Sequence, residues 1–408
     1  MNEQSQKGLI NPTIPFLCIS LQEGPHTQIQ MLQTRFFLLL VLLRPLAANS
    51  QEENGIIRLW NRVFNDTTHT AKPKFIAYPV VAFTPETSWE FGASALYVYN
   101  PKRNLENRLS EISIFSFVTL KNQYGLYLDH AIYTDQNDYF LLGKFRVSQF
   151  PLLYHGVGID TPEDPIARID GFSITLRERV LRKIKENFYA GVELDLNHFS
   201  SAEVFEPSLD FIDPAGLSGF TNFGIGLGLV YDERYNVLNP REGLFAEGGF
   251  LHYSQDLVSD YNFTNYFLDV RYYHPTLKNQ VLAGQLLINA ADASSGSEVP
   301  FNQLSLMGGE NLMRGYYLGR YRDRMLIASQ LEYRFLPFPF SRRFGGTIFG
   351  GVGAISPNVD NLNLDKFRAS GGLGLRFLLF PGKDIYTRFD VAATNEGVGY
   401  YLFIGEAF

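Results

Sequence analysis

The sequence has 408 residues, of which 19% are charged and 15% aromatic, and its formal net charge is -7. This acidic balance argues against a nucleic-acid partner. The mean hydropathy is -0.08, and no stretch approaches the roughly 20 apolar residues that a membrane-spanning helix needs, so a helical membrane protein is excluded.

The chain begins with a polar, proline-containing segment, residues 1–30. An apolar run of eight, Phe36–Leu43, then follows a basic residue and precedes two alanines. This order is typical of a secretory signal peptide over residues 31–50, with cleavage before Gln51. Residues 1–30 would then lie upstream of the natural start at Met31, either as a start-site artefact or as a disordered extension.

Residues 51–74 are polar and about as long as one linker, too short for a folded periplasmic module. The single cysteine, Cys18, precedes the signal peptide, so the mature chain has no disulfide and no thiolate metal site. The seven histidines are scattered, and none forms an H-x-x-x-H pair. We therefore expect a short periplasmic linker here, and neither a metal nor a cofactor in the mature protein.

From residue 75 to residue 408, apolar and polar residues alternate almost throughout, which is typical of strands with two different faces. In the segment 189–199, four apolar residues from Ala190 to Leu196 share one side, whereas Glu193 and Asp195 lie on the other. A soluble sandwich alternates in the same way. The signal peptide, the aromatic content and the number of such segments favour a membrane barrel with interfacial aromatic girdles.

We expect an all-β fold, a sixteen-stranded antiparallel transmembrane β-barrel over residues 75–408. The expected strands are 75–83, 89–99, 109–120, 123–134, 138–149, 169–180, 187–198, 220–231, 243–253, 263–273, 279–290, 324–335, 345–355, 368–379, 385–393 and 399–408. An even count places both ends of the barrel on the periplasmic side. The long connections 150–168, 199–219, 291–323 and 356–367 are then extracellular, and the short ones at 135–137, 274–278 and 380–384 are periplasmic.

The connection 291–323 contains the sequence MGGENLMRGYY at residues 307–317. We expect this long extracellular loop to fold back into the barrel and to bury Arg314, which then requires an acidic partner. The alternation of its strand points Glu332 inward, and the family resemblance described below makes it the candidate partner. If Arg314 or Glu332 is replaced, the loop should loosen and become accessible to protease at Arg320, Arg322 or Arg324.

Four features resemble the BamA/TamA-like outer-membrane barrel superfamily, also called the bacterial surface antigen family, most clearly over residues 220–408. They are the loop GGENLMRGYY, the turn YDERYNVLNPREG at 231–243, the strand pair around Glu332 and Phe349, and the ending YLFIGEAF. The resemblance implies that the loop motif Arg314, Gly315 and Tyr316 enters the lumen and that its arginine pairs with acids on the next two strands.

The family's second acid lies in an F-x-D-x-G pattern, which corresponds here to Phe349, Gly351 and Gly353. Because glycine replaces the aspartate, we expect Arg314 to pair on one side only, with Glu332. In the turn 231–243, Asp232, Pro240 and Gly243 are expected to have a structural role.

At the end of the sequence, Tyr400, Leu402, Ile404 and Phe408 are expected to share one face of the last strand. Phe408 resembles the insertion signal that the cell's barrel-assembly machinery reads. Gly405 would weaken this closing strand, because glycine inside a strand costs order and packing. In the family, the seam between the first and last strands can open.

The resemblance implies a bacterial outer-membrane barrel, in a form lacking POTRA domains, that assists insertion or translocation of proteins or lipids. The implied partners are outer-membrane lipids, the assembly machinery during biogenesis and unidentified client proteins. The alternative is a diffusion channel or structural barrel without insertase activity. An enzymatic barrel would need a nucleophile motif beside His155 or His252, and neither has one, so we expect no enzyme.

Overall fold

The computed structural model describes residues 21–22, 73–84, 88–104, 106–120, 122–234, 239–293, 296–381 and 384–408. The predicted signal peptide, and all but the last two residues of the predicted linker, lie outside the described residues. No helix in the described part of the chain is long and apolar enough to cross a membrane.

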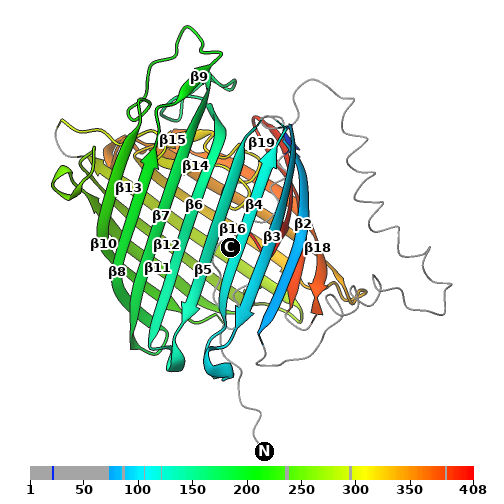
Figure 1. Ribbon diagram of the computed structural model, residues 1–408. Helices are drawn as coiled ribbons and strands as arrows, with labels where there is room; N and C mark the ends of the chain where they lie inside the picture. The colour runs from blue at the N-terminus through cyan, green and yellow to red at the C-terminus, as the bar shows by residue number, and fades with distance from the viewer. Residues whose placement is uncertain are drawn as a thin grey trace, which may run out of the picture.

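Sixteen long strands make up the described barrel, and each pairs antiparallel with the next (Figure 1). They are β2 (Lys74–Thr84), β3 (Ser88–Tyr99), β4 (Ser110–Thr119), β5 (Tyr124–Tyr133), β6 (Tyr139–Tyr154), β7 (Ala167–Lys185), β8 (Phe188–Phe199), β10 (Phe220–Asp232), β11 (Gly243–Tyr253), β12 (Phe263–Pro275), β13 (Gln280–Ala293), β16 (Met325–Phe335), β17 (Phe344–Ser356), β18 (Arg368–Phe380), β19 (Ile385–Thr394) and β20 (Gly397–Ile404). The predicted number and order of strands are confirmed.

The described residues also form short strands and 3-10 helices. They are the strands β1 (Leu21–Gln22), β9 (Glu203–Phe205), β14 (Ser305–Met307) and β15 (Tyr321–Asp323), and the 3-10 helices η2 (Pro101–Arg103), η3 (Asp135–Asn137), η4 (Gln255–Leu257), η5 (Val359–Asn361) and η6 (Leu364–Lys366). β14 and β15 pair with each other inside the connection between β13 and β16. The alternation of apolar and polar residues could not predict β14 and β15, because three residues are too few to show a period of two.

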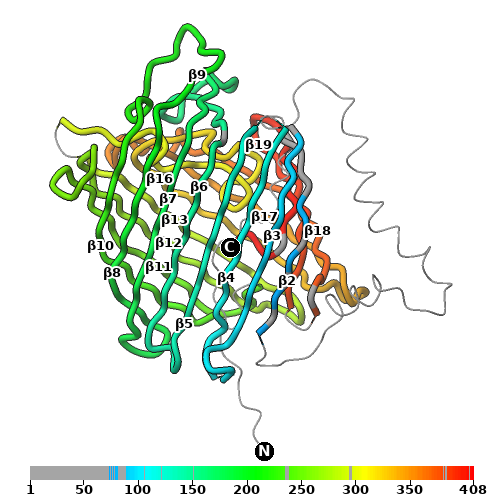
Figure 2. Tube along the Cα trace, viewed as in Figure 1, coloured from blue at the N-terminus to red at the C-terminus, as the bar shows by residue number. Residues whose placement is uncertain are grey.

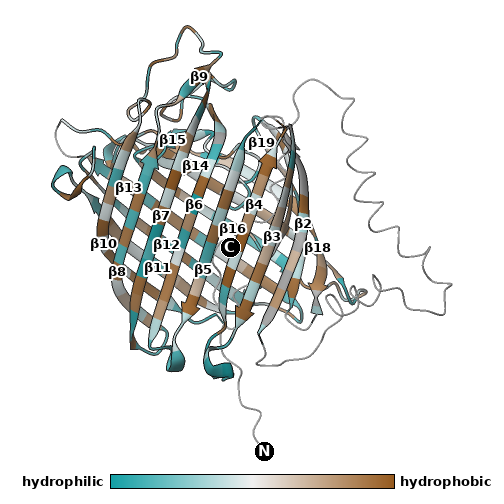
Figure 3. Ribbon diagram, in the orientation of Figure 1, coloured by the Kyte–Doolittle hydropathy of each residue, from teal (hydrophilic) through white to brown (hydrophobic). Residues whose placement is uncertain are grey.

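The sheet curves around a lumen (Figures 1 and 2), and apolar and polar residues alternate along its strands (Figure 3). Successive side chains of a strand point to opposite faces. On β4, Ile114 and Val118 are exposed on the outside, whereas Phe115 and Phe117 are buried inside. Many outward side chains of the other strands are likewise apolar and exposed. This surface is suited to contact with lipid tails.

The connections between strands differ in length at the two ends of the barrel. The longest ones, 155–166, 200–219, 294–324 and 357–367, all share one end, which we call the long-loop end. The turns 134–138, 276–279 and 381–384 lie at the other end, the short-turn end. Because every strand reverses direction, this distribution follows from the strand order and agrees with the predicted asymmetry.

The seam is the place in the barrel wall between the first strand, β2, and the last strand, β20. Within the described residues, no backbone pairing joins β2 to β20; instead, Leu21 and Gln22 of β1 pair with Tyr400 and Gly399 of β20.

Candidate functional site inside the barrel

The connection 294–324, which we call the inner loop, is packed inside the barrel wall. Met307, Met313 and Tyr316 of this loop are each fully buried. They form one apolar cluster with side chains of β16 and β17, including Leu326 and Ile355. The loop is therefore part of the core of the barrel, as the sequence predicted.

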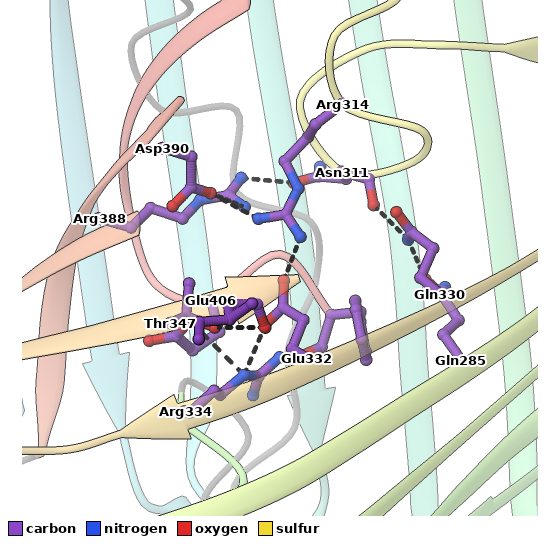
Figure 4. A network of polar contacts seen from close by, with 12 residues as sticks. Gln285, Asn311, Arg314, Gln330, Glu332, Arg334, Thr347, Arg388, Asp390 and Glu406 are labelled. Carbon is purple, nitrogen blue, oxygen red and sulfur yellow. Dashed lines mark hydrogen bonds and ion pairs between the residues drawn. The ribbon is translucent and has the colours of Figure 1, made fainter. Parts of the chain in front are cut away.

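Arg314 lies at the centre of this site, and 1% of its surface is exposed. Its guanidinium pairs with Glu332 of β16, the predicted partner, and with Asp390 of β19 at 2.5 Å (Figure 4). The Arg314 Cζ also lies 3.5 Å from the centre of the Phe349 ring, a cation–π contact. Three groups from three strands thus hold one side chain.

The expectation that Arg314 has an acid on one side only is wrong, because Asp390 supplies the second. A side chain on Gly351 would press on Met313, whose Sδ would lie 3.2 Å from the added Cβ. The position of the family's second acid is therefore packed against the inner loop. On β18, a Cβ at Gly374 would collide with the Asp390 carboxylate, so this glycine leaves room for the acid that replaces it.

Arg314 belongs to a larger cluster, which we call the luminal charge network. Arg334 pairs with Glu332 at 2.7 Å, and Arg376 pairs with Asp390 at 2.5 Å and with Glu406 at 2.9 Å. The network consists of Arg314, Glu332, Arg334, Arg376, Arg388, Asp390 and Glu406, all of them buried. Four guanidinium groups face three carboxylates, and every carboxylate contacts at least two arginines.

Gly315 and Tyr316 dock the loop motif on the last two strands. Gly315 has φ +108, and an added Cβ would lie 2.5 Å from Thr394 Cγ2. Its N–H donates to the Tyr401 hydroxyl of β20 at 2.7 Å. The hydroxyl of Tyr316 donates to Asn395, in the turn between β19 and β20, at 2.5 Å. Only glycine allows this close approach.

Gly353, the third residue predicted opposite the loop, contacts it through a different side chain. An added Cβ would lie 2.9 Å from Met307 Sδ. Its small size therefore admits β14 into the lumen, whereas Phe349 is the β17 residue that touches Arg314.

Three further arginines hold the inner loop, and the sequence analysis did not identify them as anchors. Arg320 pairs with Glu396 at 2.7 Å. Arg322 donates to the Gly319 carbonyl at 3.1 Å, and 1% of its surface is exposed. Arg388 of β19 donates to Asn311 at 2.8 Å. For Arg320 and Arg322, the available signal was the close spacing of arginines in a loop expected to turn inward, since each buried arginine requires acceptors; Arg388 lies outside this loop, on β19.

The segment Gly405–Phe408, which we call the luminal tail, turns into the barrel after β20. Gly405 has φ +93, and β20 ends at Ile404. Phe408 is 2% exposed and packs with Tyr273 and Val281, residues of β12 and β13. The expectation that Gly405 lies inside the last strand, and that Phe408 continues its face, is therefore wrong. A positive φ breaks the alternation and redirects the chain.

The turn between β10 and β11 crosses the short-turn mouth. Asp232 is buried and pairs with Arg234 at 2.9 Å, Pro240 is buried, and Gly243 has φ +105. Arg241 pairs with Asp384, in the turn between β18 and β19, at 2.7 Å. Five strands separate β11 from β19 in the sheet, so this contact requires the turn to reach across the lumen. Residues 235–238 lie outside the described part.

A family model, the Omp85 superfamily domain, matches residues 160–394. Among solved structures, the chain is similar to BamA from Haemophilus ducreyi lacking POTRA domains 1-3, at 14% identity and TM-score 0.54, over 83% of this chain and 70% of that one. CdiB from Acinetobacter baumannii matches at 12% identity and TM-score 0.51, over 81% of this chain and 59% of that one. CdiB from Escherichia coli matches at 8% identity and TM-score 0.51, over 83% of this chain and 63% of that one. No curated protein matches the sequence.

The structural matches show the barrel fold, and this chain spans less than two thirds of either CdiB chain. The family match covers more than half of the chain. Barrels of this family reside in the bacterial outer membrane and are not enzymes, which confirms the predicted location and the absence of an enzymatic role. The predicted likeness to BamA/TamA-type barrels is confirmed at the level of the superfamily. The chain belongs to the Omp85 superfamily.

Proposed function

We propose that this outer-membrane barrel assists insertion or translocation of proteins or lipids. One observation carries the proposal: Arg314 of the inner loop binds acids on β16 and β19, while Gly315 and Tyr316 bind β20 and its turn. The loop motif is therefore tied to the last strands of the barrel, including β20, the last strand itself. A loop that only narrowed a pore would have no need to contact these strands in particular.

The filled lumen argues against the alternative, a diffusion channel. The inner loop packs inside the barrel, and the turn between β10 and β11 reaches across the opposite mouth. The luminal tail adds Phe408, which packs inside the barrel against β12 and β13. Solutes would have to pass all three.

Recognition of Phe408 by the assembly machinery is a second part of this proposal. In the folded barrel Phe408 is buried in the lumen. It is therefore available to another protein only before the luminal tail folds inward, which fits a signal that is read during biogenesis.

The test is a strain in which expression of this protein can be depleted, with quantification of outer-membrane proteins and lipids. Arg314→Ala should reproduce part of the depletion phenotype. The control is Arg146→Ala, which removes the ion pair between Arg146 of β6 and Asp129 of β5, neither of which is a strand that binds the loop motif. Unchanged outer-membrane composition after depletion would refute the proposal. Equal defects in both variants would show that the loop motif has no special role.

A further inference from the structure

Two neighbouring turns at the short-turn end carry exposed apolar and basic side chains together. They are the turn 276–279 between β12 and β13, and the turn 336–343 between β16 and β17. The two turns are in contact, because the Leu336 N–H donates to the Asn279 carbonyl at 2.8 Å and the hydroxyls of Thr276 and Tyr333 are 3.0 Å apart. We call this surface the two-turn patch.

Aromatic rings extend the outer face of β16 into this patch. The rings of Phe335 and Phe338 are 5.8 Å apart, and Phe338 stacks on Phe340 at 5.1 Å with an interplanar angle of 12°. Phe340 is 85% exposed, and Leu277 of the neighbouring turn is 67% exposed. The apolar surface that faces lipid on the barrel wall therefore continues past the end of the strand.

The charge of the patch is of one sign. Neither 272–280 nor 335–344 contains an acidic residue, whereas Lys278 and Arg342 are both exposed. Other turns at this end differ: in the turn 134–138, for example, Asp135 pairs with Lys102 at 2.6 Å. Basic groups beside exposed aromatic rings fit the zone where acyl chains meet phosphate groups.

We propose that the two-turn patch is a phospholipid-binding surface, which inserts Phe340 and Leu277 into the leaflet at the short-turn end and binds anionic headgroups through Lys278 and Arg342. The occupant is a lipid because the apolar part of the patch is continuous with the lipid-facing wall. The proposal rests on the outer-membrane location and does not depend on the proposed function.

The first test measures the depth of residue 340. Cys18→Ser with Phe340→Cys gives a single site for a nitroxide label in the full-length barrel, reconstituted into phosphatidylcholine vesicles. Gln136→Cys, in the turn 134–138 at the same end, is the matched control. The label at 340 should be more accessible to oxygen than to a water-soluble nickel complex, and the label at 136 should show the reverse. Equal access of the nickel complex at both sites would overturn the proposal.

The second test measures headgroup preference. The barrel is extracted from vesicles of equal parts phosphatidylglycerol and phosphatidylcholine, and retained lipids are quantified by native mass spectrometry. Lys278→Gln and Arg342→Gln together should lower the retained ratio of phosphatidylglycerol to phosphatidylcholine, by about fivefold for each charge removed. Lys102→Gln at the same end should leave the ratio unchanged. An equal ratio in parent and double variant would refute the assigned headgroup contact.

Discussion

Single residues in the lumen are held by several partners at once. Glu332 contacts both Arg314 and Arg334, and Asp390 contacts both Arg314 and Arg376. Breaking an isolated buried pair costs about 3 to 5 kcal/mol, because the remaining charge is left without a counter-charge. Here each remaining charge keeps a partner, so single substitutions should cost less than that.

We predict a measurable coupling between Arg314 and Glu332. Arg314→Ala and Glu332→Ala should each destabilise the barrel, and the double variant should lose less than the sum, with a coupling of about 0.5 to 3 kcal/mol. Equilibrium urea unfolding of the barrel in lipid vesicles measures this. Strictly additive losses would mean that the contact contributes nothing to stability.

Gly315 is predicted to be intolerant of a side chain. Gly315→Ala combines φ +108 with a Cβ placed 2.5 Å from Thr394 Cγ2, and strain of this kind costs about 1 to 3 kcal/mol. Thr394→Ser removes that methyl group and should recover part of the loss. Gly350→Ala is the control, because its nearest neighbour would be Ser370 O at 3.6 Å. If Gly315→Ala proves as stable as the control, the docking geometry is wrong.

His155, in the connection after β6, gives a pH dependence of known sign. Burial, together with the nearby positive charge of Arg320, lowers the pKa of His155 from 6.5 to about 4. The unfolded chain then binds the proton more tightly, so the contribution of His155 is complete above pH 6.5 and is lost as the pH falls toward 4. His155→Gln should flatten the fall in unfolding free energy over this window. The control is His274→Gln, which replaces an exposed histidine and should leave the pH dependence of the unfolding free energy unchanged. Identical pH profiles for the parent and His155→Gln would contradict the assignment.

At the scale of elements, the inner loop has independent anchors. The sequence predicted that loss of Arg314 or Glu332 alone would expose Arg320, Arg322 or Arg324 to protease. In the structure Arg320 and Arg322 are buried, and Arg320 pairs with Glu396. Replacing Arg314 leaves that second anchor in place.

We therefore predict that Arg314→Ala resists trypsin as the parent does, and that Arg314→Ala with Glu396→Ala is cut in the loop. Because Arg320, Arg322 and Arg324 all remain in this double variant, fragment masses locate the cleavage. Glu396→Ala alone serves as the control and should stay intact. Rapid cleavage of the parent would show that the loop lies outside the barrel.

The barrel could be predicted from the alternation of apolar and polar residues, because the sequence of each strand shows which side chains face lipid and which face the lumen. The pattern of β16 points Glu332 inward, but its choice as the partner of Arg314 came from the family resemblance. Asp390 also alternates inward, but it lies 76 residues from Arg314, and alternation does not say which luminal acid meets which arginine. The luminal tail was missed for a related reason: the pattern of Tyr400 and Leu402 was extended past Gly405, whose positive φ ends the strand.

At the scale of the whole molecule, obstructions at the two ends of the lumen lie in series. The inner loop occupies the long-loop side, while the turn between β10 and β11, fixed by the Arg241–Asp384 pair, crosses the short-turn mouth. Barriers in series mean that opening one leaves the path blocked by the other. The parent should accordingly show no stable single-channel conductance in planar bilayers.

Deleting residues 308–319 removes the first barrier, and Asp384→Ala releases the second by removing the partner of Arg241. We predict that each change alone gives at most brief openings, and that the combined variant gives a stable conductance. Heat-modifiability on detergent gels, checked for every variant, separates a folded open barrel from a misfolded one. A steady conductance of the parent would instead support the diffusion channel. Full conductance after the loop deletion alone would show that the short-turn mouth is open, so that the inner loop by itself closes the lumen.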